Sequence, residues 1–248
     1  MSSPSDRDHY SYTVYRDPAT ARTFDDQRFG GPIGELVASE QAQVLANFAG
    51  RLNGRSILDV GAGTGRTALF LARGGARVTA VDASEAMLEI ARRRAASQNL
   101  RLRFLIADAH SLEFADRSFD VAISLRVLMH TPKWRQCVAE LCRVADRLVT
   151  IDYPSATSFA VIESLVRRVT YALGAKTEPY RVFRDRSIAR ELEKSGFSVR
   201  SVHRQFALPI AFHKMCGSRR FTRFVEGFFD RLGLLRVFGS PVTLVAER

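Results

Sequence analysis

The chain is poor in cysteine and has no long apolar run, and each shortage excludes a class of protein. Its three cysteines, Cys137, Cys142 and Cys216, cannot all pair, and their spacing fits neither a disulfide framework nor a zinc site. We therefore expect a reducing, cytoplasmic compartment. No apolar run approaches the length of a membrane-spanning helix. Residues 1–9 lack the apolar core of a signal peptide, and we expect them to be a flexible tail.

Lysine is also scarce, yet the chain is strongly basic. Lysine occurs at only four of the 248 positions, but the formal net charge is +11 because arginine is abundant. Such a surplus favours anionic partners, namely nucleic acid, a membrane surface or an acidic substrate. The basic residues are scattered rather than clustered, so a general preference for arginine is the favoured explanation.

The most informative stretch is a short apolar run that ends in alternating glycines. Residues 57–60 read Ile-Leu-Asp-Val, Gly61, Gly63 and Gly65 follow, and a helical pattern begins near residue 67. This order predicts a strand, a tight turn and a helix start, where a ligand can lie against the backbone. A dinucleotide site has the spacing G-x-G-x-x-G. Here the spacing is G-x-G-x-G, and the Asp59 carboxylate suits a cationic ligand better than a pyrophosphate.

The following segments continue a strand and helix alternation, with polar residues where strands end. Residues 77–82 predict a second strand that ends in Asp82, at about the offset where a Rossmann-type fold binds ribose hydroxyls. Ser84 then resembles a helix N-cap. Residues 102–106 and 119–124 predict a third and a fourth strand, and Asp108 follows the third.

These four segments in order resemble the class I S-adenosylmethionine (SAM) methyltransferases, over roughly residues 50–155. The resemblance implies an α/β fold with a Rossmann-like seven-stranded, mostly parallel sheet, helices on both faces, an antiparallel last strand and a helical cap. We expect one domain over 1–248. It would comprise an N-terminal lid (10–50), a cofactor-binding core (51–152) and two cap elements (153–184 and 207–239).

The resemblance implies that the cofactor is S-adenosyl-L-methionine and that S-adenosyl-L-homocysteine is its product. The implied binding residues lie in the lid, in the glycine motif and after the second, third and fourth strands. They are Tyr15, Arg28, Asp59, Gly61, Ala62, Gly63, Asp82, Ala83, Met87, Asp108, Ala109, Ser124, Leu125 and Arg126.

Few side chains are candidates for the chemistry, since methyl transfer from SAM needs mainly alignment, exclusion of water and, for some acceptors, removal of a proton. His130 follows the fourth strand and is the candidate general base. Arg126 could orient an anionic acceptor, and Asp152 either faces the pocket or is solvated. Metal-dependent relatives carry an acid at the end of the fourth strand, where this chain has Ser124, and an Asp-Asn pair after the fifth, where it has Asp152-Tyr153, so we expect no metal.

The methyl acceptor is the feature that the sequence defines least. We expect methyl transfer to an O or C atom of a small, mainly apolar acceptor, as in the ubiquinone- and menaquinone-biosynthesis-like group. The alternatives are an RNA methyltransferase and a SAM-binding protein without catalysis. No Asn/Asp-Pro-Pro-Tyr follows the fourth strand, so we expect no DNA partner. No separate RNA-binding domain is visible, which disfavours RNA.

The aromatic and arginine-rich residues 217–238 predict one helix. It would pack as core, wall an acceptor pocket or rest on an anionic membrane as a peripheral contact. We expect residues 153–180 and 217–238 to pack together around a mainly apolar pocket, with Arg126 and His130 at its floor.

Overall fold

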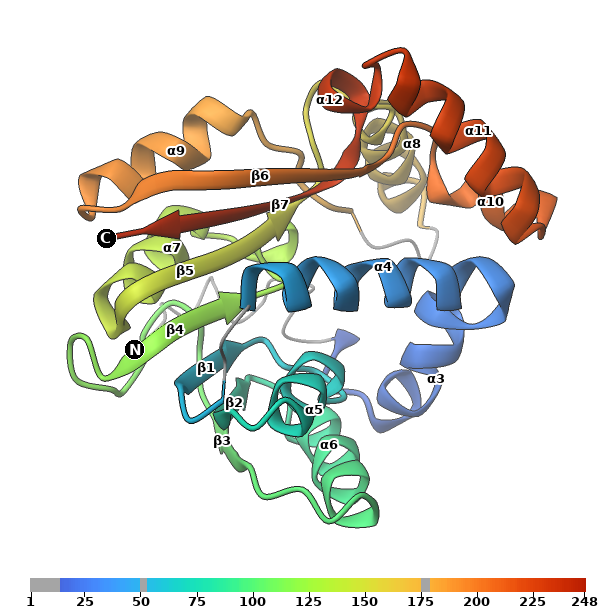
Figure 1. Ribbon diagram of the computed structural model, residues 1–248. Helices are drawn as coiled ribbons and strands as arrows, with labels where there is room; N and C mark the ends of the chain where they lie inside the picture. Colours follow the sequence, from blue (N-terminus) through green and yellow to red (C-terminus); the bar gives the residue numbers. More distant parts are fainter. Residues whose placement is uncertain (1–13, 50–52, 175–178) are drawn as a thin grey trace.

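The computed structural model describes residues 14–49, 53–174 and 179–248, so the expected tail and small parts of the lid and cap segments lie outside the described residues. Helices surround a seven-stranded sheet (Figure 1). The strands are β1 (Ser56–Val60), β2 (Arg77–Asp82), β3 (Arg103–Ile106), β4 (Phe119–Ser124), β5 (Ala145–Tyr153), β6 (Ser198–Phe206) and β7 (Ser240–Glu247). The helices are α3 (Pro18–Phe29), α4 (Gly31–Ala49), α5 (Arg66–Arg73), α6 (Glu85–Ser97), the 3-10 turn η1 (Leu128–His130), α7 (Trp134–Val144), α8 (Ala160–Ala172), α9 (Asp185–Lys194), α10 (Ile210–Cys216), α11 (Arg219–Arg231) and α12 (Leu235–Phe238).

The strand order is β3-β2-β1-β4-β5-β7-β6. Strands β1 to β5 pair in parallel, and β7 pairs antiparallel with both β5 and β6. The predicted sheet and its antiparallel last strand are therefore confirmed. The order reverses between β1 and β4, and ligands of open α/β sheets bind at such a switch point, beyond the carboxyl ends of the strands.

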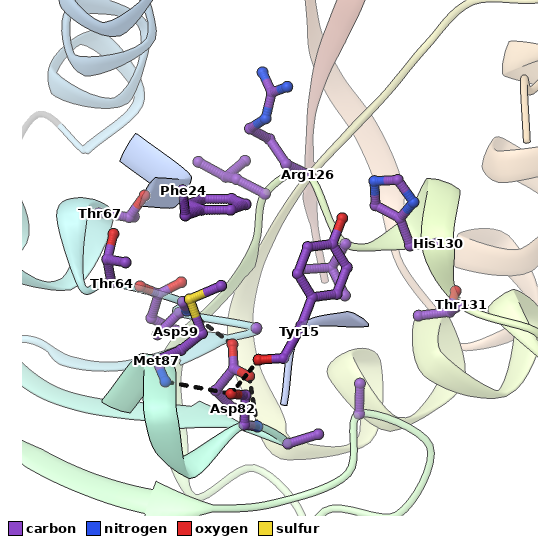
Figure 2. A pocket seen from close by; sticks show the side chains of 18 of the residues that line it. Tyr15, Phe24, Asp59, Thr64, Thr67, Asp82, Met87, Arg126, His130 and Thr131 are labelled. Carbon is purple, nitrogen blue, oxygen red and sulfur yellow. Dashed lines mark hydrogen bonds between the residues drawn. The ribbon is translucent and has the colours of Figure 1, made fainter. Parts of the chain in front are cut away.

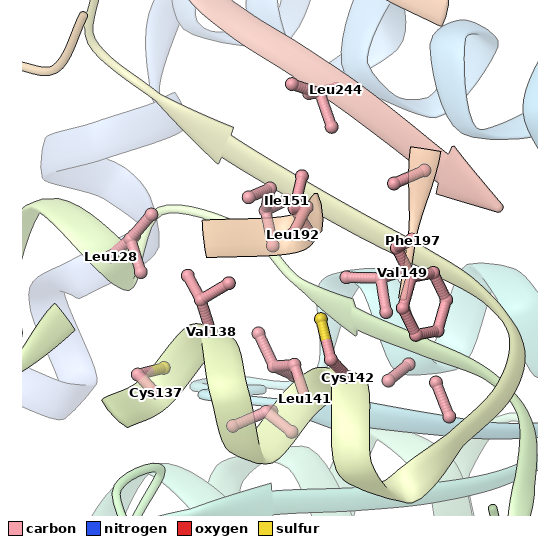
Figure 3. Packing of buried hydrophobic residues seen from close by; sticks show 14 of the residues in the cluster. Leu128, Cys137, Val138, Leu141, Cys142, Val149, Ile151, Leu192, Phe197 and Leu244 are labelled. Carbon is pink, nitrogen blue, oxygen red and sulfur yellow. The ribbon is translucent and has the colours of Figure 1, made fainter. Parts of the chain in front are cut away.

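Apolar side chains cover both faces of this sheet. On one face, α4 and α5 contribute Leu45, Ala68 and Leu71 to a buried cluster with β1, β2 and β4. On the other, α7 and α9 contribute Val138, Leu141 and Leu192 to a larger cluster with the central strands, part of which Figure 3 shows. Cys137 and Cys142 lie inside this second cluster as small apolar groups, and burial raises the pKa of both thiols to about 12.

Most predicted boundaries agree with the structure to within two or three residues, but three segments do not, and one of them is α10, which was not predicted. Residues 217–238 are not one helix: α11 ends at Arg231, Gly233 follows with φ of 72°, and α12 is a separate short turn. Helix α3 was not predicted. Its start has a clear signal, since the Asp17 side chain caps the backbone N–H groups of Ala19 and Thr20 and Pro18 occupies the first turn.

Candidate functional site

A cavity opens at the carboxyl ends of β1, β2 and β4, beneath the N-terminal segment and α3. Its wall combines the glycine loop after β1, the ends of β2 and β3, the segment after β4, and side chains of α3. Figure 2 shows Asp59, Asp82, Met87, Tyr15 and His130 around this space. The switch point of the sheet therefore holds the cavity that the topology predicts.

The glycine loop keeps a backbone path that side chains would block. Gly61 and Gly63 have φ of 73° and 54°, in the left-handed region that favours glycine. A Cβ on Gly61 would lie 2.2 Å from Val127 Cγ2, whereas a Cβ on Gly63 would meet no described atom within 4 Å. Gly61 thus allows close packing with the segment after β4, and Gly63 leaves open the space into which a ligand fits.

Asp82 fixes this loop from the end of β2. One carboxylate oxygen accepts from the Gly63 N–H at 2.8 Å, and the other accepts from the Ser84 N–H at 2.8 Å. Burial raises the pKa of Asp82, and these backbone hydrogen bonds oppose the rise. The carboxylate is held at the cavity wall by the same amides that it orders.

Asp59 is a buried carboxyl group with spare hydrogen-bonding capacity. It is 2% exposed, and its Oδ2 has no hydrogen-bond partner among the described residues. Burial, with a smaller contribution from the nearby Asp82, raises its pKa to about 7. A buried acceptor of this kind at the cavity wall suits a positively charged ligand group, which would replace the missing partner.

The N-terminal segment covers the cavity. The Tyr15 carbonyl accepts from the Ser84 hydroxyl at 2.5 Å, and the Tyr15 ring lies edge-on to the His130 ring at 5.8 Å between centroids. The Arg28 guanidinium lies 3.5 Å from the Tyr15 hydroxyl. Both lid residues expected from the sequence therefore line the cavity.

Helix α3 is tied to the glycine loop by a polar network. The Thr64 hydroxyl donates to the Asp25 carboxylate at 2.9 Å, and the Arg94 guanidinium of α6 donates to the same carboxylate. Next to it, the Arg66 guanidinium stacks on the Phe29 ring at 3.4 Å from the centroid. These contacts hold the lid closed over the loop.

Arg126 stands where the cavity continues beyond β4. Its φ is 62°, and its backbone N–H donates to the Asp152 carboxylate at the end of β5. Burial raises the pKa of Asp152 to about 6, and the nearby Arg126 opposes the rise. Burial, with repulsion from Arg28, lowers the pKa of Arg126 itself. Among the described residues, its guanidinium forms no hydrogen bond or salt bridge.

A second cavity adjoins the first beneath the cap, and Arg28 and Arg126 line both. Its other walls include α8, residues 206–214 and the end of β5. The structure differs from the expected pocket in the composition of its wall and in the place of His130. Residues 217–238 do not line it, and its wall mixes apolar side chains with four cations and two acids. These charged residues are Arg28, Arg126, Arg167, Lys214, Asp152 and Glu163. His130 lines the first cavity only.

Thirteen of the fourteen residues expected at the cofactor line the first cavity. The exception is Ser124, which is fully buried within β4 and donates its hydroxyl to the Val60 carbonyl at 3.0 Å. Sequence reasoning missed several wall residues, among them Phe29, Thr64, Arg66 and His110. Thr64 and Arg66 lie within or beside the glycine motif, so their position in the sequence could have predicted that they line the cavity. Phe29 required knowledge of how α3 folds back.

The Asp108 carboxylate contacts the neighbouring His110. Its Oδ1 accepts from the His110 backbone N–H at 2.9 Å and lies 2.7 Å from His110 Nδ1.

Within residues 14–49, 53–174 and 179–248, no group of three His, Cys, Asp or Glu side chains is placed to hold a metal ion. In the same ranges, no helix is both long and apolar enough to cross a bilayer.

Residues 57–147 match the family model described as a methyltransferase domain. The chain is 45% identical over 91 residues to a demethylmenaquinone methyltransferase of Clavibacter sepedonicus, covering 37% of each chain. It is 42% identical over 143 residues to the methyltransferase GfsG of Streptomyces halstedii, covering 56% of this chain and 47% of that protein. The chain spans about half the length, or less, of the curated relatives it matches.

The fold also resembles solved structures over nearly its whole length. Magnesium protoporphyrin IX methyltransferase from Synechocystis, with bound S-adenosylhomocysteine, superposes with a TM-score of 0.64 at 20% identity, covering 95% of this chain and 99% of that one. The family match over residues 57–147 thus identifies a methyltransferase domain of the class I SAM-dependent type, and the strand order and the cavity agree with it. The cofactor of this class is S-adenosyl-L-methionine, and the open glycine loop and the unpartnered Asp59 oxygen fit it.

Proposed function

We propose that this chain transfers a methyl group from SAM to an O or C atom of a small acceptor that binds in the cavity beneath the cap. The observation that carries the proposal is the pair of adjoining cavities that share Arg28 and Arg126. One cavity has the features of the cofactor site, and the other reaches the same place from the cap side. A donor and an acceptor bound in the two cavities would meet at these arginines.

When bound, SAM supplies a methyl group already activated by its sulfonium. The chain's own residues then have to align the donor with the acceptor, shield both from water and neutralise the charge of the donor. Asp59 offers an unpartnered carboxyl oxygen to a cationic group, Asp82 a carboxylate fixed at the loop, and Gly63 the space between them. Tyr15 and α3 lie over the cavity, where they would help to exclude water from the bound donor.

The charged residues of the second cavity support an acceptor that carries an anionic group. Lys214 donates to the carbonyls of Gln27 and Arg28 at 3.0 and 3.1 Å, which brings its ammonium to the lid. Partial burial, then repulsion from Arg126 and Arg28, lowers the pKa of Lys214. A bound anion would relieve this repulsion. The apolar wall residues, such as Phe159, Leu208 and Ile210, would hold the rest of the molecule.

His130 is the proposed general base for an acceptor with a hydroxyl or an acidic C–H group. It is buried, lines the cofactor cavity and lies against Tyr15. Its function there would be to hold the proton that the acceptor loses on methylation. A His130→Asn variant tests this, because it should lower kcat while leaving binding of S-adenosylhomocysteine within about twofold.

The whole proposal is tested in two stages. Titration calorimetry should first show one site for S-adenosylhomocysteine. An acceptor screen should then compare matched pairs of small apolar alcohols and phenols with and without a carboxylate, with S-adenosylhomocysteine formation as the readout. Turnover of the carboxylate member alone supports the acceptor class. Cofactor binding without turnover of any acceptor, protein-free RNA included, would favour a binding protein without catalysis.

A further inference from the structure

The two long helices of the cap are oriented the opposite way to ordinary surface helices. In α8 the only buried residue is Ser164, and the charged side chains of Glu163 and Arg167 line the cavity beneath. The apolar side chains of the same helix point outward: Ile162 is 60% exposed and Leu165 is 62% exposed. A surface helix normally places its apolar stripe toward the core.

Helix α11 has the same inverted arrangement. Its only buried residue is Thr222, which bonds to the buried His213 at 3.1 Å, and Glu226 bonds to the other nitrogen of that ring at 2.7 Å. The Glu226 carboxylate also accepts from the backbone N–H groups of residues 207 and 208. Polar contacts therefore anchor α11, while Phe224 on its other side is 75% exposed.

The exposed apolar residues of the molecule are concentrated on this cap. Of nineteen large hydrophobic residues exposed in the described structure, sixteen lie within 159–173 and 212–238. Figure 1 shows α8, α10, α11 and α12 gathered at one end of the molecule, beside the end of β6. Apolar surface on this scale marks a region that contacts another phase or molecule.

The positive charge of the cap indicates which kind of partner this apolar surface can contact. Residues 159–173 and 210–238 hold eight Lys and Arg but only three Asp and Glu, and the whole chain carries +11. Two of those three acids are engaged internally, by Arg167 and His213. A second copy would bring two cationic faces together, which electrostatic repulsion opposes. A bilayer with anionic lipids offers both an apolar phase and a complementary charge.

We propose that the outward faces of α8 and α11 dock this protein on the surface of an anionic membrane. Phe224, Phe228, Ile162 and Leu165 enter the boundary between headgroups and acyl chains, and arginines such as Arg220 and Arg223 contact lipid phosphates. Docking is peripheral, since no helix in the described residues could span the bilayer. It also places the cap cavity, whose wall is the inner face of α8, next to the lipid phase.

Vesicle co-sedimentation tests the docking without any acceptor. The wild-type chain should bind vesicles of phosphatidylcholine with about one third phosphatidylglycerol at least tenfold more strongly than phosphatidylcholine alone, and salt should weaken the binding. Phe224→Ser with Phe228→Ser, and separately Ile162→Ser with Leu165→Ser, should each reduce binding about tenfold. Ile106→Ser is the matched control, because Ile106 is 62% exposed but lies on β3, away from the cap.

Binding of S-adenosylhomocysteine by every variant controls for folding, so a failure of docking is distinct from a failure of the methyltransferase proposal. The inference is overturned if the wild-type chain ignores anionic vesicles, or if the cap variants bind them as well as the control variant does. It is equally overturned if sedimentation velocity shows a dimer that the cap variants dissociate while vesicle binding is absent.

Discussion

The cavity at the glycine loop, proposed for the cofactor, and the cavity beneath the cap, proposed for the acceptor, are built on opposite principles, and they are called here the cofactor half and the acceptor half. Around the first cavity, backbone amides, glycines and short acids at strand ends define the space, and the helices behind them bury apolar faces. Beneath the cap, long side chains of α8 and α10 define the space, and α8 buries its polar side. On the proposed function, backbone geometry would bind the cofactor, and side chains of the cap helices would select the acceptor.

The largest effect should come from filling the cofactor half. Gly63→Arg places a side chain into the open space beside the loop, and binding of S-adenosylhomocysteine should fall more than about 100-fold, as calorimetry would measure. Gly54→Arg is the matched control, since Gly54 also has a positive φ and no described atom within 4 Å of its Cβ. Equal loss in both variants would mean that backbone strain, not occupancy, is responsible.

This contrast also explains how much the sequence could predict. The G-x-G-x-G spacing, Asp82 at a strand end and Ser84 as an N-cap depend on local geometry, so the first four strands followed from the sequence pattern, and the thirteen cavity residues followed from the family resemblance that these motifs carry. The cap did not follow, because a helical period identifies an apolar face without saying which way it points. The apolar stripe of α11 predicts a pocket wall, but the buried His213–Glu226 contact turns that stripe outward. Likewise, Ser124 is the last residue of the expected strand, but its hydroxyl bonds within the sheet and does not reach the cavity.

The next largest effect concerns the boundary between the halves. Arg126→Gln removes a guanidinium that has no described hydrogen-bond partner, so it should raise KM for a carboxylate-bearing acceptor about 10- to 100-fold. Binding of S-adenosylhomocysteine should change less than about threefold. Arg135→Gln is the control, because Arg135 is exposed and forms its ion pair with Glu191 away from both cavities. A KM that is unchanged for charged acceptors would contradict the anionic acceptor.

A pH titration would show whether the cofactor half relies on a buried carboxylate. The pKa of Asp59 is raised to about 7, and a cationic cofactor binds its ionised form, so SAM affinity should fall up to about tenfold per unit as pH drops below 7. Since the cofactor's own amino group also titrates, Asp59→Asn is the reference and should lose this dependence. The stability of the cofactor-free protein should depend on pH in the opposite sense. Because the pKa of Asp59 is higher in the folded than in the unfolded chain, its stabilising contribution is complete below about pH 4 and is lost as pH rises through 7.

The smallest effect should come from the contacts that close the lid over the cofactor half. Asp25 accepts from Thr64 of the glycine loop and from Arg94 of α6, and Asp25→Asn would remove the charge that holds both donors. The side chains are partly exposed, so the loss should be modest, and S-adenosylhomocysteine should dissociate about fivefold faster in stopped-flow measurements. Glu85→Gln, which breaks an exposed pair with Arg92 outside the lid, should leave the rate unchanged. If both variants dissociate at the wild-type rate, α3 does not limit cofactor release, and the cover over this half consists of Tyr15 and its neighbours alone.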